Sequence, residues 1–130
     1  FYGRAMTAGD IYTVAGTGKR GFSGDGGPAA SAQLGEPSGV LVDGAGNLLI
    51  ADTFNSRVRV VAVRTGTFYG RAMTAGDIYT VAGTGRAGFS GDGGPATAAE
   101  LSDPLAAVLD GAGGLVITDS GTGRIRVVAG

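Results

Sequence analysis

The hydrophobic residues of this chain fall in short runs and alternating stretches, a pattern typical of β-strands. The runs are rich in β-branched and aromatic residues, which favour strands over helices. No segment combines a helical period with residues that would cap a helix, although residues 29–34 could form a short isolated one. The strands predicted in the first half of the chain are residues 11–15, 40–42, 48–51 and 57–63. The pattern predicts an all-β fold.

Turn-forming residues separate these strands. The sequence Asp-Gly-Ala-Gly-Asn at 43–47 supplies residues that tolerate positive φ in a tight hairpin. Residues 53–56 form a second short turn, whereas residues 16–37 and 64–77 are long connections. Asp43, like its repeat Asp110, precedes a glycine, so turn chemistry explains both better than catalysis does.

The chain repeats itself. Residues 1–18 return unchanged as residues 68–85, and the register then holds without insertion to Gly130. The loop sequence Gly-Phe-Ser-Gly-Asp-Gly-Gly-Pro-Ala occurs at 21–29 and again at 88–96. Because packing alone tolerates conservative exchange, complete identity indicates a recent duplication. The chain is therefore two tandem copies of one β-rich unit.

Residues 36–61, Glu-Pro-Ser-Gly-Val through Arg-Val-Arg-Val-Val, resemble an NHL repeat. That family begins a repeat with Pro-x-Gly-Val-x-Val-Asp, continues through a Gly-Asn turn and an Ala-Asp strand end, and closes with Asn-x-Arg-Ile. The second copy, residues 103–128, departs from the pattern at Ala106, Gly114 and Thr122. It is similar to a degenerate or terminal repeat.

The resemblance implies β-propeller blades of four antiparallel strands, here a two-blade fragment of a six-bladed propeller. Residues 1–18 would hold the outer strand of a preceding blade and a loop. Residues 19–85 would form the first blade with long loops, and residues 86–130 a second blade without its outer strand. We favour a fragment of a longer protein. If the chain is complete, three copies would close a six-bladed ring as a homotrimer.

The composition of the chain argues against several classes of function. The net charge of -1 provides no electrostatic surface for nucleic acid, and no apolar run is long enough to cross a membrane. The chain has no Cys and no His, so it lacks the side chains that usually bind zinc and the commonest general base. We expect no catalytic residues, no metal and no cofactor. The loops resemble those of secreted bacterial NHL arrays, which implies a bacterial source and an extracellular or cell-surface location.

The weak candidates for a binding surface are aromatic and cationic residues in the long loops. Tyr2 and Arg4 occur in the first copy of the repeat, and Tyr69 and Arg71 in the second. Tyrosine and arginine are enriched at recognition surfaces. The same composition also suits a loop that binds to its own blade, and the two interpretations are evenly weighted.

Two acid–base pairs recur at the strand ends. Asp52 and Asp119 end the second strand of each unit, and Arg57 and Arg124 begin the third. A ring of ligand-binding polar groups is one interpretation, and a turn-stabilising ion pair is the favoured one. In the glycine-rich loops, Phe22 and its repeat are expected to act as apolar anchors.

The family resemblance implies a recognition or scaffold module for protein or carbohydrate. One alternative is a fragment of a lactonase-like or lyase-like six-bladed enzyme, whose relatives use His, Glu and Asn ligands. Another is a spacer repeat in a large secreted bacterial protein.

Overall fold

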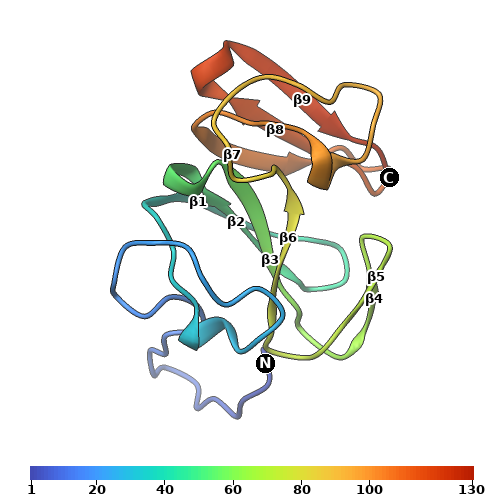
Figure 1. The fold of residues 1–130 in the computed structure, drawn as a ribbon. Helices are drawn as coiled ribbons and strands as arrows, with labels where there is room; N and C mark the ends of the chain where they lie inside the picture. The colour runs from blue at the N-terminus through green and yellow to red at the C-terminus, as the bar shows by residue number, and fades with distance from the viewer.

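The computed structural model describes residues 1–130 and is all-β, as the hydrophobic pattern predicts. A four-stranded antiparallel sheet has the order β1-β2-β3-β6, and a three-stranded antiparallel sheet has the order β7-β8-β9. The strands of the first sheet are β1 (Pro37–Val42), β2 (Leu48–Asp52), β3 (Arg57–Val61) and β6 (Ile78–Ala82). Those of the second sheet are β7 (Pro104–Leu109), β8 (Leu115–Asp119) and β9 (Arg124–Val128). In Figure 1 the three-stranded sheet lies across one face of the four-stranded sheet.

Four single turns of 3-10 helix complete the regular structure. They are η1 (Ala29–Ser31), η2 (Thr53–Asn55), η3 (Ala96–Ala98) and η4 (Ser120–Thr122). The first occupies part of the short helix expected at residues 29–34.

The β1–β2 hairpin closes through Asp43, as the sequence predicts. The Asp43 Oδ1 atom accepts hydrogen bonds from the amides of Ala45 at 2.9 Å and Asn47 at 2.8 Å. Gly46 has a φ of +95°, a conformation that favours glycine. Asp110 repeats the arrangement by accepting the amides of Ala112 and Gly114. Both aspartates therefore accept the backbone amides of their own hairpin turns.

The two sheets share one core between them. Val58 and Val60 of β3 are fully buried on the face that meets the second sheet. Leu115 and Ile117 of β8 belong to the same cluster of buried side chains. Each aliphatic side chain buried in this way contributes roughly 1.5–3 kcal/mol to stability. The opposite face of the first sheet packs Ile50 and its neighbours against the η1 loop.

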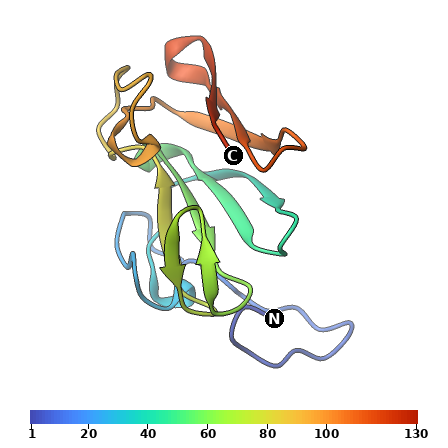
Figure 2. The ribbon, with the colours of Figure 1, turned by 90° about the vertical axis from the view of Figure 1, so that its right-hand side faces the viewer.

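The expected strand at residues 11–15 is not formed. These residues have no strand assignment, and Ile11 is 98% exposed. A strand needs a partner for its backbone groups, and no strand lies beside this segment. Figures 1 and 2 show the N-terminal segment as a looped chain at the end of the molecule remote from the three-stranded sheet.

The long connection at 64–77 contains a hairpin that the hydrophobic pattern did not reveal. Strands β4 (Gly66–Phe68) and β5 (Arg71–Met73) pair antiparallel. The two turn residues, Tyr69 and Gly70, have φ values of +52° and +75°. Positive φ at both central residues is the geometry of a type I′ hairpin turn. Figure 2 shows this hairpin standing in front of β6.

Candidate functional site

A buried arginine joins the glycine-rich loop to the first sheet. The Arg59 side chain is fully buried and forms ion pairs with Asp52 at 3.3 Å and with Asp25 at 2.8 Å. Its Nη1 also donates to the Gln33 carbonyl, and its Nη2 to the Ser23 carbonyl, each at 2.8 Å. Arg59 therefore connects strands β2 and β3 to both ends of the loop. We call Arg59, Asp52 and Asp25 the arginine clasp.

The clasp corrects the ion pair expected from sequence. Arg57 lies directly opposite Asp52 in the β2–β3 register, yet it forms no ion pair. Its guanidinium instead stacks over the Phe22 ring at 3.6 Å from the centroid and donates to the Thr84 carbonyl. Burial lowers the pKa of Arg57 from its ordinary value, with Arg59 adding to the effect and Asp25 and Asp52 opposing it. The Phe22 ring thus anchors the loop through cation–π contact and not through apolar packing alone.

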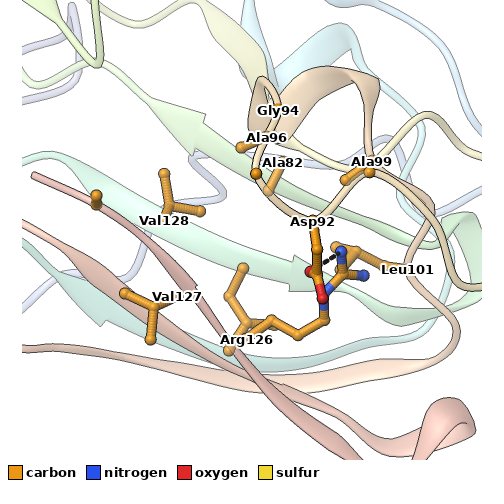
Figure 3. A pocket seen from close by; sticks show the side chains of 13 residues that line it. Ala82, Asp92, Gly94, Ala96, Ala99, Leu101, Arg126, Val127 and Val128 are labelled. Atoms are coloured by element: carbon orange, nitrogen blue, oxygen red, sulfur yellow. Dashed lines mark hydrogen bonds and ion pairs between the residues drawn. The ribbon is translucent and has the colours of Figure 1, made fainter.

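The second unit repeats the clasp almost atom for atom. Arg126 pairs with Asp119 at 3.5 Å and with Asp92 at 3.0 Å, and it donates to the carbonyls of Glu100 and Ser90. Figure 3 shows the bond between Arg126 and Asp92. Arg126 takes the role expected of Arg124, which stacks on Phe89 as Arg57 stacks on Phe22. The pairs expected at the strand ends, Asp52–Arg57 and Asp119–Arg124, are neighbours in the strand register but form no ion pair.

The two units differ at Asn55 and Thr122, but both side chains donate to the buried aspartate. The Asn55 amide donates to Asp52 Oδ2 at 2.9 Å, and the Thr122 hydroxyl donates to Asp119 Oδ2 at the same distance. The second carboxylate oxygen accepts a backbone amide in both units, at 2.7 Å. The buried carboxylates are therefore fully paired, and the recurring acids and arginines form structural networks. No group of three or more His, Cys, Asp or Glu side chains is arranged to hold a metal ion.

Polar groups of a different kind meet at the β4–β5 hairpin. The Tyr69 hydroxyl donates to Asp43 Oδ2 at 2.7 Å and ties the hairpin to the β1–β2 turn. Burial, together with that carboxylate, raises the pKa of Tyr69. Burial acts to raise the pKa of Asp43 as well, but hydrogen bonds from Tyr69, Asn47 and the backbone outweigh it and lower that pKa.

An open groove of about 670 Å³ runs beside this hairpin. Its walls are the β1–β2 turn, the tip of the β4–β5 hairpin, the β7–β8 turn of the second unit, and Ala129 and Gly130. Tyr69 and Asp43 present a ring and a carboxylate to it, and Phe68 and Leu109 provide apolar surface. We call this space the hairpin groove.

The structure brings the two candidate tyrosines to the same turn. The Tyr2 hydroxyl donates to the Gly46 carbonyl at 3.2 Å, so Tyr2 and Tyr69 both contact the β1–β2 turn. Burial and the nearby Asp43 carboxylate raise the pKa of Tyr2. The two candidate arginines are not brought together, because Arg4 lies over Tyr12 and Arg71 over Tyr79.

Comparison with known proteins gives one partial similarity. A stretch of 56 residues is 43% identical to part of Protein SUPPRESSOR OF QUENCHING 1, chloroplastic, from Arabidopsis thaliana. The stretch covers 43% of this chain and 5% of that protein, so the chain corresponds to a small part of the relative's length. No family model matches the chain. The structure has no helix with the length and apolarity needed to cross a bilayer.

Proposed function

We propose that the chain is a two-blade segment of an NHL-type β-propeller and serves as a non-catalytic recognition module. In this proposal the four-stranded and three-stranded sheets are blades, and the hairpin groove binds a protein segment or a carbohydrate. The observation that carries the proposal is the convergence of Tyr69 and Asp43 on an open groove between the two units.

The chemistry of the groove suits recognition. An aromatic ring fixed by a hydrogen bond loses little conformational freedom when a ligand stacks on it. The two oxygens of the Asp43 carboxylate already accept four hydrogen bonds within the chain, so its part is to hold the Tyr69 ring in place. Arg71, whose guanidinium lies 4.7 Å from the centroid of the Tyr79 ring, is exposed on the same hairpin but does not line the groove. Because the hairpin is held to the β1–β2 turn, its side chains are positioned before a ligand arrives.

The difference between the two copies of the tyrosine–arginine sequence supports a binding role over a spacer role for residues 68–71. Only the second copy of the tyrosine–arginine sequence forms the hairpin, and only there does the β7–β8 turn supply a further wall. A surface built from two adjoining units is characteristic of repeat proteins that bind ligands across their repeats.

The proposal is tested by screening the 130-residue chain against a glycan array and a displayed peptide library. We expect a bound glycan or peptide whose affinity falls at least tenfold in the variant Tyr69→Ala, which removes the ring that lines the hairpin groove. The matched control is Thr97→Ala, an exposed residue that does not line the hairpin groove. Ligands that bind the Tyr69→Ala variant and the parent chain equally, or the absence of any ligand in both screens, would overturn the proposal.

A further inference from the structure

The outer edge of β9 has no partner, although the equivalent edge of the first sheet has one. Strand β3 pairs with β6, with Val61 opposite Ile78 and Arg59 opposite Thr80. Strand β9 has nearly the same sequence as β3, and it pairs only with β8. An unpaired edge of this kind exposes a row of backbone donors and acceptors to another strand.

In the first unit, β6 fills a slot between β3 and the glycine-rich loop. The Gly26 amide donates to the Ile78 carbonyl at 2.7 Å, and the Ile78 amide donates to the Gly27 carbonyl at 2.9 Å. Asp25 of the clasp also accepts a hydrogen bond from the Thr80 hydroxyl. Strand β6 is thus held on both of its edges.

The same slot exists, empty, in the second unit. A groove of about 420 Å³ lies between β9 and residues 91–96, with Gly93, Gly94 and Val128 among its walls (Figure 3). Gly93 has a φ of +84°, the value found at its counterpart Gly26, so the loop already has the conformation that receives a strand. Asp92 is 72% exposed, whereas Asp25 beside β6 is 33% exposed. We call this space the edge groove.

The chain contains a second copy of the strand that fills the first slot. Residues 10–16 are identical to residues 77–83, which include β6. The Gly16 amide donates to the Ala29 carbonyl at 3.0 Å, as the Gly83 amide does to the Ala96 carbonyl. Residues 10–16 therefore lead into the first unit in the way that β6 leads into the second.

We propose that residues 10–16 of a second copy of this chain insert into the edge groove and pair antiparallel with β9. The register of the first sheet places Ile11 of the second copy opposite Val128 and Thr13 opposite Arg126. The Thr13 hydroxyl would then donate to Asp92, as the Thr80 hydroxyl donates to Asp25. Backbone pairing supplies affinity and the buried side chains supply specificity, as in other cases of strand addition.

The apolar face of the second sheet supports the same partner. Ile125 and Val127 of β9 are 66% and 60% exposed, whereas their counterparts Val58 and Val60 are fully buried by the next sheet. A second copy whose residues 10–16 occupy the edge groove would bring its own four-stranded sheet toward this face. The contact is head-to-tail, so it generates a closed ring if the rotation closes and an open fibre if it does not. We expect a closed ring. Each copy supplies one four-stranded and one three-stranded sheet, so a ring of six such sheets would contain three copies.

The test is the mass of the 130-residue chain in solution, measured by light scattering over a range of concentrations. The parent chain should form a discrete oligomer at high concentration, and Ile11→Asp should keep it a monomer. Ala5→Asp adds the same charge to the same segment, but Ala5 and its counterpart Ala72 are both exposed, so it should assemble like the parent. A parent chain that stays monomeric, or an Ile11→Asp variant that assembles normally, would overturn the proposal.

A labelled peptide with the sequence of residues 10–16 identifies the groove itself. It should bind the monomeric Ile11→Asp variant and shift the NMR signals of Val127 and Val128. Assembly of the parent without such binding would place the interface elsewhere and refute the edge groove. If a further repeat of a longer polypeptide is the true occupant, the peptide binds but the parent chain stays monomeric, which rejects the second copy as donor.

Discussion

Residues 1–18 and 68–85 have the same sequence, and only one of the two segments becomes sheet. Ile78 is fully buried in β6, whereas Ile11 is 98% exposed. The local turn is the same in both, because the amide of Thr7 donates to the Tyr12 hydroxyl as the amide of Thr74 donates to that of Tyr79. Local sequence therefore determines the turn, and a strand forms only where β3 and the glycine-rich loop supply partners. Intrinsic β-propensity alone does not make a strand.

The arginine clasp holds the loop that β6 packs against, so removing it gives the largest expected effect. Arg59→Ala leaves the fully buried Asp52 carboxylate without its cation, and we expect a loss of about 3–5 kcal/mol in the free energy of unfolding. Arg126→Ala also leaves a fully buried carboxylate, that of Asp119, without its cation. It should still cost less, because Arg126 is itself 9% exposed and its second partner Asp92 is mostly exposed and remains hydrated. Urea unfolding of both variants measures the two losses in the free energy of unfolding. Equal losses would contradict the unequal burial of the two clasps.

The clasp also shows what the sequence could and could not predict. Apolar runs predict β1, β2 and β3, and the sequence identifies Asp52 as an ion-pairing residue. Its partner was expected to be Arg57, the nearest arginine across the turn, because sequence distance does not reveal that Phe22 and the Thr84 carbonyl occupy the Arg57 guanidinium. The loop that supplies Phe22 is distant in the chain, so only the fold shows this competition.

Two other expectations failed for reasons of context. Residues 11–15 have strand composition but no partner strand, which no local pattern can reveal. The β4–β5 hairpin turns at Tyr69 and Gly70, a pair without the usual Asn-Gly or Asp-Gly signal, since a tyrosine rarely adopts a positive φ. The hairpin groove could not be predicted, because its walls come from three separate turns and from residues 129–130.

The two isoleucines provide a direct contrast between the identical segments. Ile78→Ala should lower the free energy of unfolding by about 2–5 kcal/mol, since it leaves a cavity in a packed site. Ile11→Ala should change it by less than about 0.5 kcal/mol, as is usual for an exposed residue. Both values are measured by chemical denaturation in dilute protein, where the chain is monomeric. A large effect at Ile11 under those conditions would mean that residues 10–16 pack within their own chain.

The two tyrosines offer a milder contrast. Tyr69→Phe removes the hydrogen bond to Asp43 and should cost about 0.5–1.5 kcal/mol. Tyr2→Phe removes a longer hydrogen bond to a backbone carbonyl, and its cost should lie at or below the lower end of that range. Thermal unfolding monitored by circular dichroism compares the two. A larger loss of stability for Tyr2→Phe would contradict the ranking of the two hydrogen bonds.

The smallest effect is a dependence of the hairpin on pH. The pKa of Asp43 is lowered from 3.8 in the folded chain, so its contribution is present above that pH and is lost as the pH falls below it. The pKa of Tyr69 is raised from 10.0, so its contribution is present below pH 10 and is lost as the pH rises further. Amide NMR signals of β4 and β5 should shift at both extremes. In Tyr69→Phe the alkaline shift should disappear, and its persistence would assign it to another group.

Amide hydrogen exchange tests most directly whether partners, and not sequence, make the strand. NMR is the required method, because peptides cut from the two identical segments have the same mass. The Ile78 amide donates to Gly27 in the structure, whereas the Ile11 amide has no partner. At the lowest usable protein concentration, Ile78 should therefore exchange at least a hundredfold more slowly than Ile11. Equal protection of the two amides in the monomer would contradict the account.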